Sequence, residues 1–321
     1  MTTQTSEPAS ARSVGPTYVT LAFGRRIRAS VVRGFAWAAL LSNALISVTG
    51  AVVRVTGSGL GCTTWPDCHP GTLVPDSRTG MAAIHQAVEF GNRTITGPVL
   101  IASLGTFVLL ALLRPARPQL RNLAFVGPIG VAFQAVWGGI TVRMGLAWWT
   151  VMPHLLVSLV LVFFAAVVVV RLGESDAAPR PVAPRALAVL TWVTAGVLAA
   201  VTVSGTIVTA TGPHAGDAAT PRLGWDLREA AQLHADLMFL YLGLIAALAV
   251  ALVATHAPRV LKVRIGWLVG LTVAQGALGM TQYFLGVPEA MVVAHVALAV
   301  TLVAVAAFTC MATRERAATK P

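Results

Sequence analysis

The amino-acid sequence predicts an all-α polytopic membrane protein, with eight transmembrane helices arranged as two pseudo-symmetric four-helix bundles. Three observations predict this fold class. The chain of 321 residues is 56% hydrophobic and only 11% charged, whereas soluble domains are about 25% charged. Its apolar residues fall into runs long enough to cross a bilayer, which takes about 20 residues per helix. Short motifs also recur in the two halves of the chain at a constant spacing.

Eight apolar runs define the predicted spans. The second run is longer than a span requires, so its first residues are expected to lie outside the bilayer. Residues 1–30 are polar and contain arginine, and the first apolar run after them is long enough to span, so no cleavable signal is predicted. The predicted spans are residues 34–53, 80–113, 122–142, 148–171, 187–211, 229–254, 263–284 and 288–312.

The basic residues predict which side of the membrane each loop faces. The two terminal segments and the loops after the second, fourth and sixth runs hold 17 Lys and Arg residues, against five in the other loops. Because cytoplasmic loops of membrane proteins collect Lys and Arg, both termini are predicted to be cytoplasmic, in a cell membrane. The net charge of +11 therefore reflects membrane topology, and we expect no nucleic-acid partner.

The stretch GCTTWPDCHP, residues 61–70, puts Cys62 and Cys68 in the first outward loop. Disulfides persist in oxidising compartments, and five intervening residues that include Pro66 let the chain turn back on itself, so a disulfide is predicted. It could be permanent or redox-active, and two free thiols are the alternative. A metal site would need more ligands than the adjacent His69 supplies.

An internal repeat divides the chain. The motif GAVVRVTGSGLG of the first half resembles GTIVTATGPHAG of the second. Gln134 and Gln275 lie 141 residues apart, as do His154 and His295, and this shared spacing indicates a duplication. The predicted units are a cytoplasmic tail at 1–33, an N-terminal bundle at 34–178, a C-terminal bundle at 179–312 and a cytoplasmic tail at 313–321.

The repeat aligns His234 with Asn92, so a histidine in one half corresponds to an asparagine in the other. A competing alignment pairs His234 with His85 and requires a gap. With the first alignment, the two halves are expected to have different roles.

Four histidines, His85, His154, His234 and His295, fall in the outer halves of the even-numbered spans. Ionisable residues inside a membrane are costly, and a single one often serves helix packing. Four at similar depth favour ligation, and haem iron takes axial imidazoles from facing helices. His234 and His295 are predicted to ligate one iron, and His154, with His85 or by itself, another. A copper site is less favoured, because the sequence lacks a Met or Cys cluster. The other histidines, His69, His214 and His256, are expected to be solvated loop residues.

The segment HQAVEFGNR carries His85, Glu89 and Asn92 on one face of a helix. Glu89 is the only acidic residue of its span, and a buried carboxylate is costly unless it is paired or protonated. One interpretation is an ion pair with Arg93, four residues further on. The other is a carboxylate beside a bound cofactor that moves protons or stabilises a developing charge.

Together, the strings R-x-T-G-S-G-L-x-C…W-P-x-C and E-F-x-x-R and the later histidines resemble the haem A synthase family over nearly all of residues 34–312. The resemblance implies that haem b is a cofactor held between His234 and His295. The N-terminal bundle would bind haem O as its substrate and oxidise the C8 methyl group to a formyl group, giving haem A for terminal oxidase assembly. The implied site residues are Glu89 as the catalytic group, His85, Asn92, Arg93 and His154 at the substrate haem, and the cysteine pair Cys62 and Cys68.

One position departs from the family, because many members have a histidine where this chain has Asn92. The implied partners are a haem O synthase upstream, an aa3-type cytochrome oxidase downstream and membrane lipid, and a homo-oligomer is left open. Two other functions use the same features. One is a di-haem b-type membrane cytochrome that transfers electrons from quinol, and the other is a transporter of haem or an ion.

Overall fold

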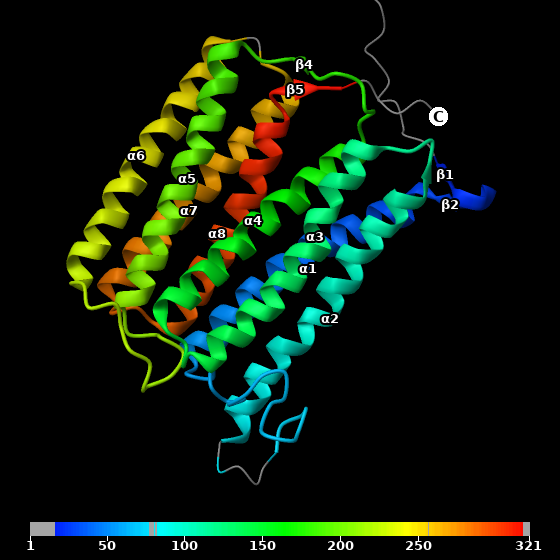
Figure 1. The fold of residues 1–321 in the computed structure, drawn as a ribbon. Coiled ribbons are helices and arrows are strands. Elements are labelled where there is room, and N and C mark those ends of the chain that lie inside the picture. Colours follow the sequence, from blue (N-terminus) through cyan, green and yellow to red (C-terminus); the bar gives the residue numbers. More distant parts are fainter. Residues whose placement is uncertain (1–16, 77–79, 81, 256, 317–321) are drawn as a thin grey trace, which may run out of the picture.

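The computed structural model describes residues 17–76, 80, 82–255 and 257–316, which form eight α-helices long and apolar enough to cross a membrane (Figure 1). The predicted all-α polytopic fold is confirmed. The helix ends agree with the predicted runs to within five residues, because apolar length is a local property of the sequence. The helices are α1 Ala29–Val55, α2 Ala83–Leu112, α3 Pro118–Arg143, α4 Trp148–Leu172, α5 Arg185–Thr211, α6 Leu227–Ala254, α7 Arg259–Phe284 and α8 Glu289–Met311.

Short strands close one end of the molecule, which we call the inner end; the opposite end, which carries the disulfide loop, is the outer end (Figure 1). Strand β1 (Tyr18–Leu21) pairs antiparallel with β2 (Arg26–Arg28) and β3 (Leu113–Arg114), and β4 (Arg180–Pro181) pairs with β5 (Arg314–Glu315). A 3-10 helix, Ala22–Gly24, links β1 to β2. Strands of two to four residues are too short for an alternating pattern, so the sequence did not predict them.

Some predictions concern residues outside the described ranges. Those for residues 1–16 and 317–321, which make up parts of the two predicted tails, lie outside the described residues, as does the one for His256. The described residues of the predicted N-terminal tail, 17–33, form the hairpin of β1 and β2 and the start of α1.

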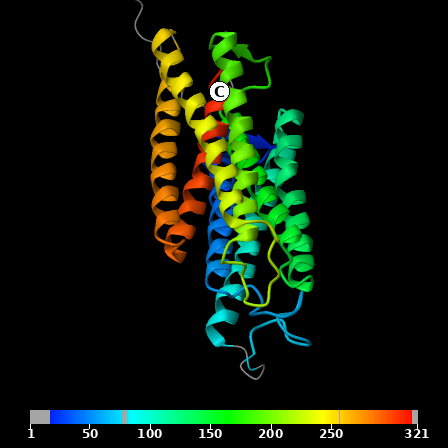
Figure 2. The same cartoon turned by 90° about the vertical axis from the view of Figure 1, so that its left-hand side faces the viewer.

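The helices contact one another in two rings. In the first half α1 contacts α2, α2 contacts α3, α3 contacts α4 and α4 contacts α1, and helices α5 to α8 repeat this order. The even-numbered helices of each ring therefore lie diagonally. The rings meet where α8 packs against α1 and α4, with α3 at one side of the molecule and α7 at the other (Figure 2). The functional division between residues 178 and 179 stays a prediction.

Proline sets the starts of several helices. Helices α5, α7 and α8 begin directly after Pro184, Pro258 and Pro288. In α6 the side chain of Asp226 accepts a hydrogen bond from the backbone nitrogen of Glu229, so the first turn is capped. Interior prolines, such as Pro98 in α2, are tolerated in spanning helices because neighbouring groups satisfy the freed backbone.

The main apolar core joins both halves and lies toward the inner end. It includes Leu40 of α1, Val162 of α4, Leu248 of α6, Leu261 of α7 and Ala307 of α8, all at most 3% exposed. Close packing is therefore concentrated away from the disulfide loop. The polar and ionisable side chains that the sequence singled out lie nearer the outer end.

Candidate functional site

Three of the four membrane histidines lie at one level near the outer end. His154 and His295 come six residues after the first residues of α4 and α8, and His234 seven after that of α6. His85 follows the first residue of α2 by only two, and α2 extends beyond the other helices at its outer end (Figure 1). Its Nδ1 atom lies 2.9 Å from Oγ of Ser58. The predicted common depth therefore holds for three histidines and is wrong for His85.

In the C-terminal half, both histidines pack against neighbouring helices. Nδ1 of His234 lies 2.9 Å from Oγ of Ser204 in α5. Nε2 of Gln275 in α7 donates to the backbone carbonyl of His295 at 3.1 Å. Nδ1 of His295 is buried without a partner among the described residues. Gly279 allows this close approach, because a Cβ atom there would lie 2.9 Å from Cε1 of His295.

The N-terminal half repeats the contact between a glutamine and the backbone of a histidine. Nε2 of Gln134 in α3 donates to the backbone carbonyl of His154 at 2.8 Å. Nδ1 of His154 is again buried and, within the described ranges, unpartnered. A Cβ atom at Gly138 would lie 3.4 Å from Cε1 of the same ring. The repeat predicted from the spacing of 141 residues is thus visible as equivalent contacts in space.

The contact between Ser204 and His234 also has an equivalent in the N-terminal half, formed by different residues. In the N-terminal half, Oγ1 of Thr49 in α1 lies 2.7 Å from Oδ1 of Asn92 in α2. This contact joins the first two helices of its half as the contact between Ser204 and His234 does in the other half. The geometry therefore agrees with the alignment of Asn92 with His234.

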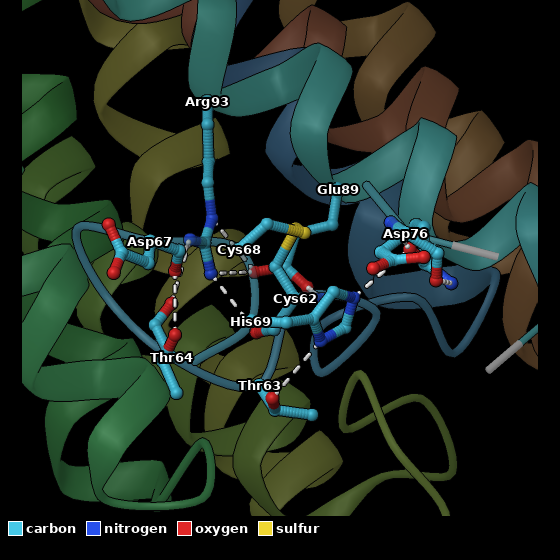
Figure 3. Close-up of a disulfide and its surroundings, with 10 residues drawn as sticks. Cys62, Thr63, Thr64, Asp67, Cys68, His69, Asp76, Glu89 and Arg93 are labelled. Atoms are coloured by element: carbon cyan, nitrogen blue, oxygen red, sulfur yellow. Dashed lines mark hydrogen bonds and ion pairs between the residues drawn. A yellow bond between two sulfur atoms is a disulfide. The ribbon is translucent and has the colours of Figure 1, made fainter. Parts of the chain in front are cut away.

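Glu89 is buried, with 4% of its surface exposed, and both of its carboxylate oxygens have partners. The backbone nitrogen of Cys62 donates to Oε2 at 2.7 Å, and Nε of Arg93 donates to Oε1 at 3.1 Å. The Arg93 guanidinium also donates to the backbone carbonyls of Cys62 and Thr64 at 3.1 and 2.8 Å (Figure 3). The ion pair is therefore present, and it fastens the cysteine loop to α2. These contacts favour a positioning role for Arg93.

The predicted disulfide between Cys62 and Cys68 is confirmed, and both residues are fully buried (Figure 3). Its loop also reaches α3. Nη2 of Arg143 donates to the carbonyl of Trp65 at 2.7 Å, and the Trp65 ring packs on Gly139, where a Cβ atom would lie 2.5 Å from it. Fastened to α2 and α3, the loop lies at the outer end of the N-terminal ring of helices.

The prediction that His69 is a solvated loop residue is wrong. Only 4% of its surface is exposed, Nε2 lies 3.0 Å from Oε1 of Gln86 in α2, and Nδ1 lies 3.3 Å from Oγ1 of Thr63. His214 is partly buried and its Nε2 lies 2.9 Å from the carbonyl oxygen of Val287. His69 thus joins the cysteine loop to α2, and His214 joins the loop after α5 to the segment before α8, which local polarity did not reveal.

Removing the disulfide tests how firmly the loop is held. Cys68→Ser is expected to lower the free energy of unfolding by about 2 kcal/mol, because a closed loop of this size removes chain entropy from the unfolded state. The measurement is thermal unfolding in detergent. Reduction of the wild-type chain should produce the same shift and leave Cys68→Ser unchanged. Unfolding of Cys68→Ser at the wild-type temperature would show that the hydrogen bonds alone hold the loop.

Arg54, in the last turn of α1, bridges the two halves. From the end of α1 it donates to the backbone carbonyls of Thr209 and His214, near the end of α5. In the loop after α5, Arg222 donates to the carbonyl of Pro213, and partial burial lowers the pKa of the Arg222 guanidinium from its usual value. At the outer end the halves are thus joined by the Arg54 contacts and by a hydrogen bond from the backbone nitrogen of Gly59 to the carbonyl of Gly216 at 2.8 Å.

The donor set fits a porphyrin iron better than a small metal ion. No cluster of three or more His, Cys, Asp or Glu side chains that could hold an ion exists among the described residues. Instead, His154 and His295 each present a buried ring with an unpartnered nitrogen, next to a glycine that keeps space beside the ring. Buried polar atoms normally have partners, so these two rings are the candidates for contact with a bound group.

Comparison with known proteins gives a consistent result. A family model described as a cytochrome oxidase assembly protein, COX15-CtaA, matches residues 33–307. A heme A synthase of Symbiobacterium thermophilum is 34% identical over 144 residues, 42% of this chain and 45% of that protein. One of Lysinibacillus sphaericus is 33% identical over 146 residues, 44% of each chain. A protoheme IX farnesyltransferase of Thermus thermophilus is 36% identical over 80 residues, 25% of this chain and 12% of that protein. The matches thus span less than half the length of these relatives.

Proposed function

The chain belongs to the cytochrome oxidase assembly protein family COX15-CtaA, and we propose that it acts there as a haem A synthase. Haem O would be the substrate, and the C8 methyl group of its ring would become the formyl group of haem A. The observation that carries this proposal is the equivalent pair of buried imidazoles, His154 and His295, one in each half of a chain of this family.

The C-terminal half is proposed to hold haem b as the resident cofactor. His234 and His295 lie at one level on diagonal helices of one ring, the arrangement by which helical bundles present axial ligands. Ser204 contacts the His234 ring, and Gln275 holds the backbone of His295, so the chain orients both residues. When bound, the haem iron would supply one-electron transfer to the other half.

The N-terminal half is proposed to be the substrate site, where His154 would hold the haem iron. Converting the methyl group to a formyl group adds one oxygen atom and removes two hydrogen atoms, with the electrons passing to an oxidant such as dioxygen. The chain must therefore hold the substrate porphyrin in a fixed position and take up protons. Glu89 lies three residues before Asn92, about one helical turn outward, and borders that level.

Glu89 is the proposed catalytic group. Its carboxylate is kept in one orientation by Arg93 and by the backbone nitrogen of Cys62. Held in this way, the carboxylate could accept a proton from the methyl group of the substrate or stabilise positive charge that develops on its carbon. The disulfide loop above it would exclude water from the reaction.

Topology and partners follow from the same proposal. The strands that contain Tyr18 and Arg314 lie at the inner end and the disulfide at the outer end, which supports cytoplasmic termini in a cell membrane and a cysteine loop outside. A haem O synthase would supply the substrate, and an aa3-type oxidase would consume the product. The partial match to a protoheme IX farnesyltransferase is consistent with such a supply step.

Pigment analysis tests the function directly. Co-expression with a haem O synthase, followed by extraction and mass analysis of the bound pigments, is expected to yield haem A, and cells with haem O synthase alone should yield haem O. Bound haem b without conversion of haem O would instead favour the di-haem cytochrome. Flux of haem into liposomes without conversion would favour the transporter.

A further inference from the structure

The two halves share one set of contacts and differ in another. The glutamine–histidine contact between the third and fourth helices is the same in both, with Gln134 and His154 matching Gln275 and His295. The contact between the first and second helices also recurs, but its residues differ. One half has a hydroxyl beside an imidazole, and the other has a hydroxyl beside a carboxamide.

The Asn92 carboxamide lies in the N-terminal half at the place that the His234 imidazole has in the C-terminal half. Thr49 and Asn92 join α1 to α2 as Ser204 and His234 join α5 to α6. Haem iron in proteins is held by imidazole, thiolate, thioether or phenolate groups, and a carboxamide is not among them. The position that supplies an axial ligand in the C-terminal half therefore supplies none in the N-terminal half.

His85 lies too far outward to be the second ligand of an iron bound by His154. It precedes Asn92 by seven residues, which puts it about 10 Å further outward along α2. Two axial ligands of one iron face each other across the ring, so on diagonal helices they must lie at one level. His154 is at the level of the histidines of the other half, and His85 is bound to Ser58 beyond it.

We infer that the N-terminal half holds a porphyrin iron through His154 alone, with Thr49 and Asn92 occupying the place of the second axial ligand. The C-terminal half holds its iron through both His234 and His295. This inference rests on the proposed function and goes beyond it, because it assigns a coordination state to each half.

The difference matches what each half has to do. A resident cofactor must stay bound, and two imidazoles slow its dissociation. A substrate haem must enter and its product must leave, and affinity differences of this kind appear mainly as differences in dissociation rate. The open axial position would also admit a small exogenous ligand, which the closed C-terminal site would exclude.

Spectroscopy of the whole chain in detergent, titrated to saturation with haemin, tests the inference. We expect two spectral components by optical and electron paramagnetic resonance measurements. One is low-spin, from the C-terminal half, and the other is high-spin, from the N-terminal half. Cyanide should convert only the high-spin component. A wild-type chain saturated at both sites with low-spin iron alone would overturn the inference and leave the proposed function standing.

Exchanging the differing residues provides matched variants. In a chain whose C-terminal site is removed by His234→Ala with His295→Ala, the remaining haemin should be high-spin. Adding Asn92→His should make it low-spin and abolish cyanide binding. Conversely, His234→Asn in the otherwise unchanged chain should turn the C-terminal component high-spin. If the combined variants fail to fold, His234→Asn and the wild-type cyanide titration still decide the question.

His85→Gln tests the remaining alternative, in which His85 is the second ligand of the iron in the N-terminal half. It is expected to leave the spin state and the cyanide response of the N-terminal component unchanged. A low-spin N-terminal component that His85→Gln converts to high-spin would overturn the inference and identify His85 as the second ligand. A wild-type chain that takes up no haemin in either half would contradict both the inference and the proposed function.

Discussion

Glu89→Gln is expected to reduce haem A formation by about 100- to 10,000-fold, the range lost when a positioned acid or base is removed. Glutamine has nearly the same shape and can still accept the hydrogen bond from the backbone nitrogen of Cys62. It cannot take up a proton or stabilise positive charge as a carboxylate does. The measurement is the ratio of haem A to haem O in extracted pigments, with the bound haem spectrum recorded on the same sample.

A structural role must be separated from this catalytic one, because Glu89 also fastens the cysteine loop through Arg93. Arg93→Gln keeps the carboxylate and its bond to the backbone nitrogen of Cys62, and removes the fastening through the guanidinium. If Glu89 only held the loop, both substitutions would reduce product formation equally and lower thermal stability together. Asp236→Asn, which alters an exposed carboxylate bonded to Gln232 in the outer part of α6, is the matched control and should leave product formation unchanged.

His295→Ala is expected to abolish the low-spin haem component of the C-terminal half completely. Without the second imidazole, any iron that stays on His234 has an open axial position and becomes high-spin. The substitution also creates a cavity between α7 and α8, because Gly279 packs directly on the lost ring. Free imidazole added to the purified variant should therefore restore the low-spin spectrum. Optical titration with imidazole measures this recovery.

His214→Ala is the matched control for loss of a histidine. This residue lies in the outward loop after α5 and contacts the carbonyl of Val287, away from the level of the ring nitrogens in α6 and α8. It should leave the low-spin component intact. A full low-spin spectrum in His295→Ala without added imidazole would contradict the assignment of His295 as an axial ligand.

The eight helices and their order could be predicted because each spanning helix is a continuous run of apolar residues in the sequence. Twenty or so apolar residues can satisfy their backbone in lipid only as a helix, whatever the rest of the chain does. The cysteine pair could be predicted for a similar reason, since Cys62 and Cys68 are close in sequence as well as in space. The short strands at the inner end could not, because they pair segments far apart, such as Arg180 with Glu315.

The candidate site was predicted in part. Residue type and spacing singled out His154, His234 and His295, and the structure puts all three at one level. Spacing also left two interpretations of Glu89, and the structure contains the ion pair without excluding the catalytic role. The burial of His69 against Gln86 had no local signal, since the loop around it is as polar as a solvated one.

By itself, the sequence determined the fold class and the number of spans, and it singled out the histidines proposed to ligate iron, because apolar length and residue type are properties of short segments. Only the tertiary structure decided which hydroxyl meets which residue across α1 and α2 or α5 and α6, and so favoured the alignment of His234 with Asn92 over the one with His85. It also decided that Arg54 bridges the halves. Such contacts join segments that meet only when helices pack, and the packing depends on all eight helices together.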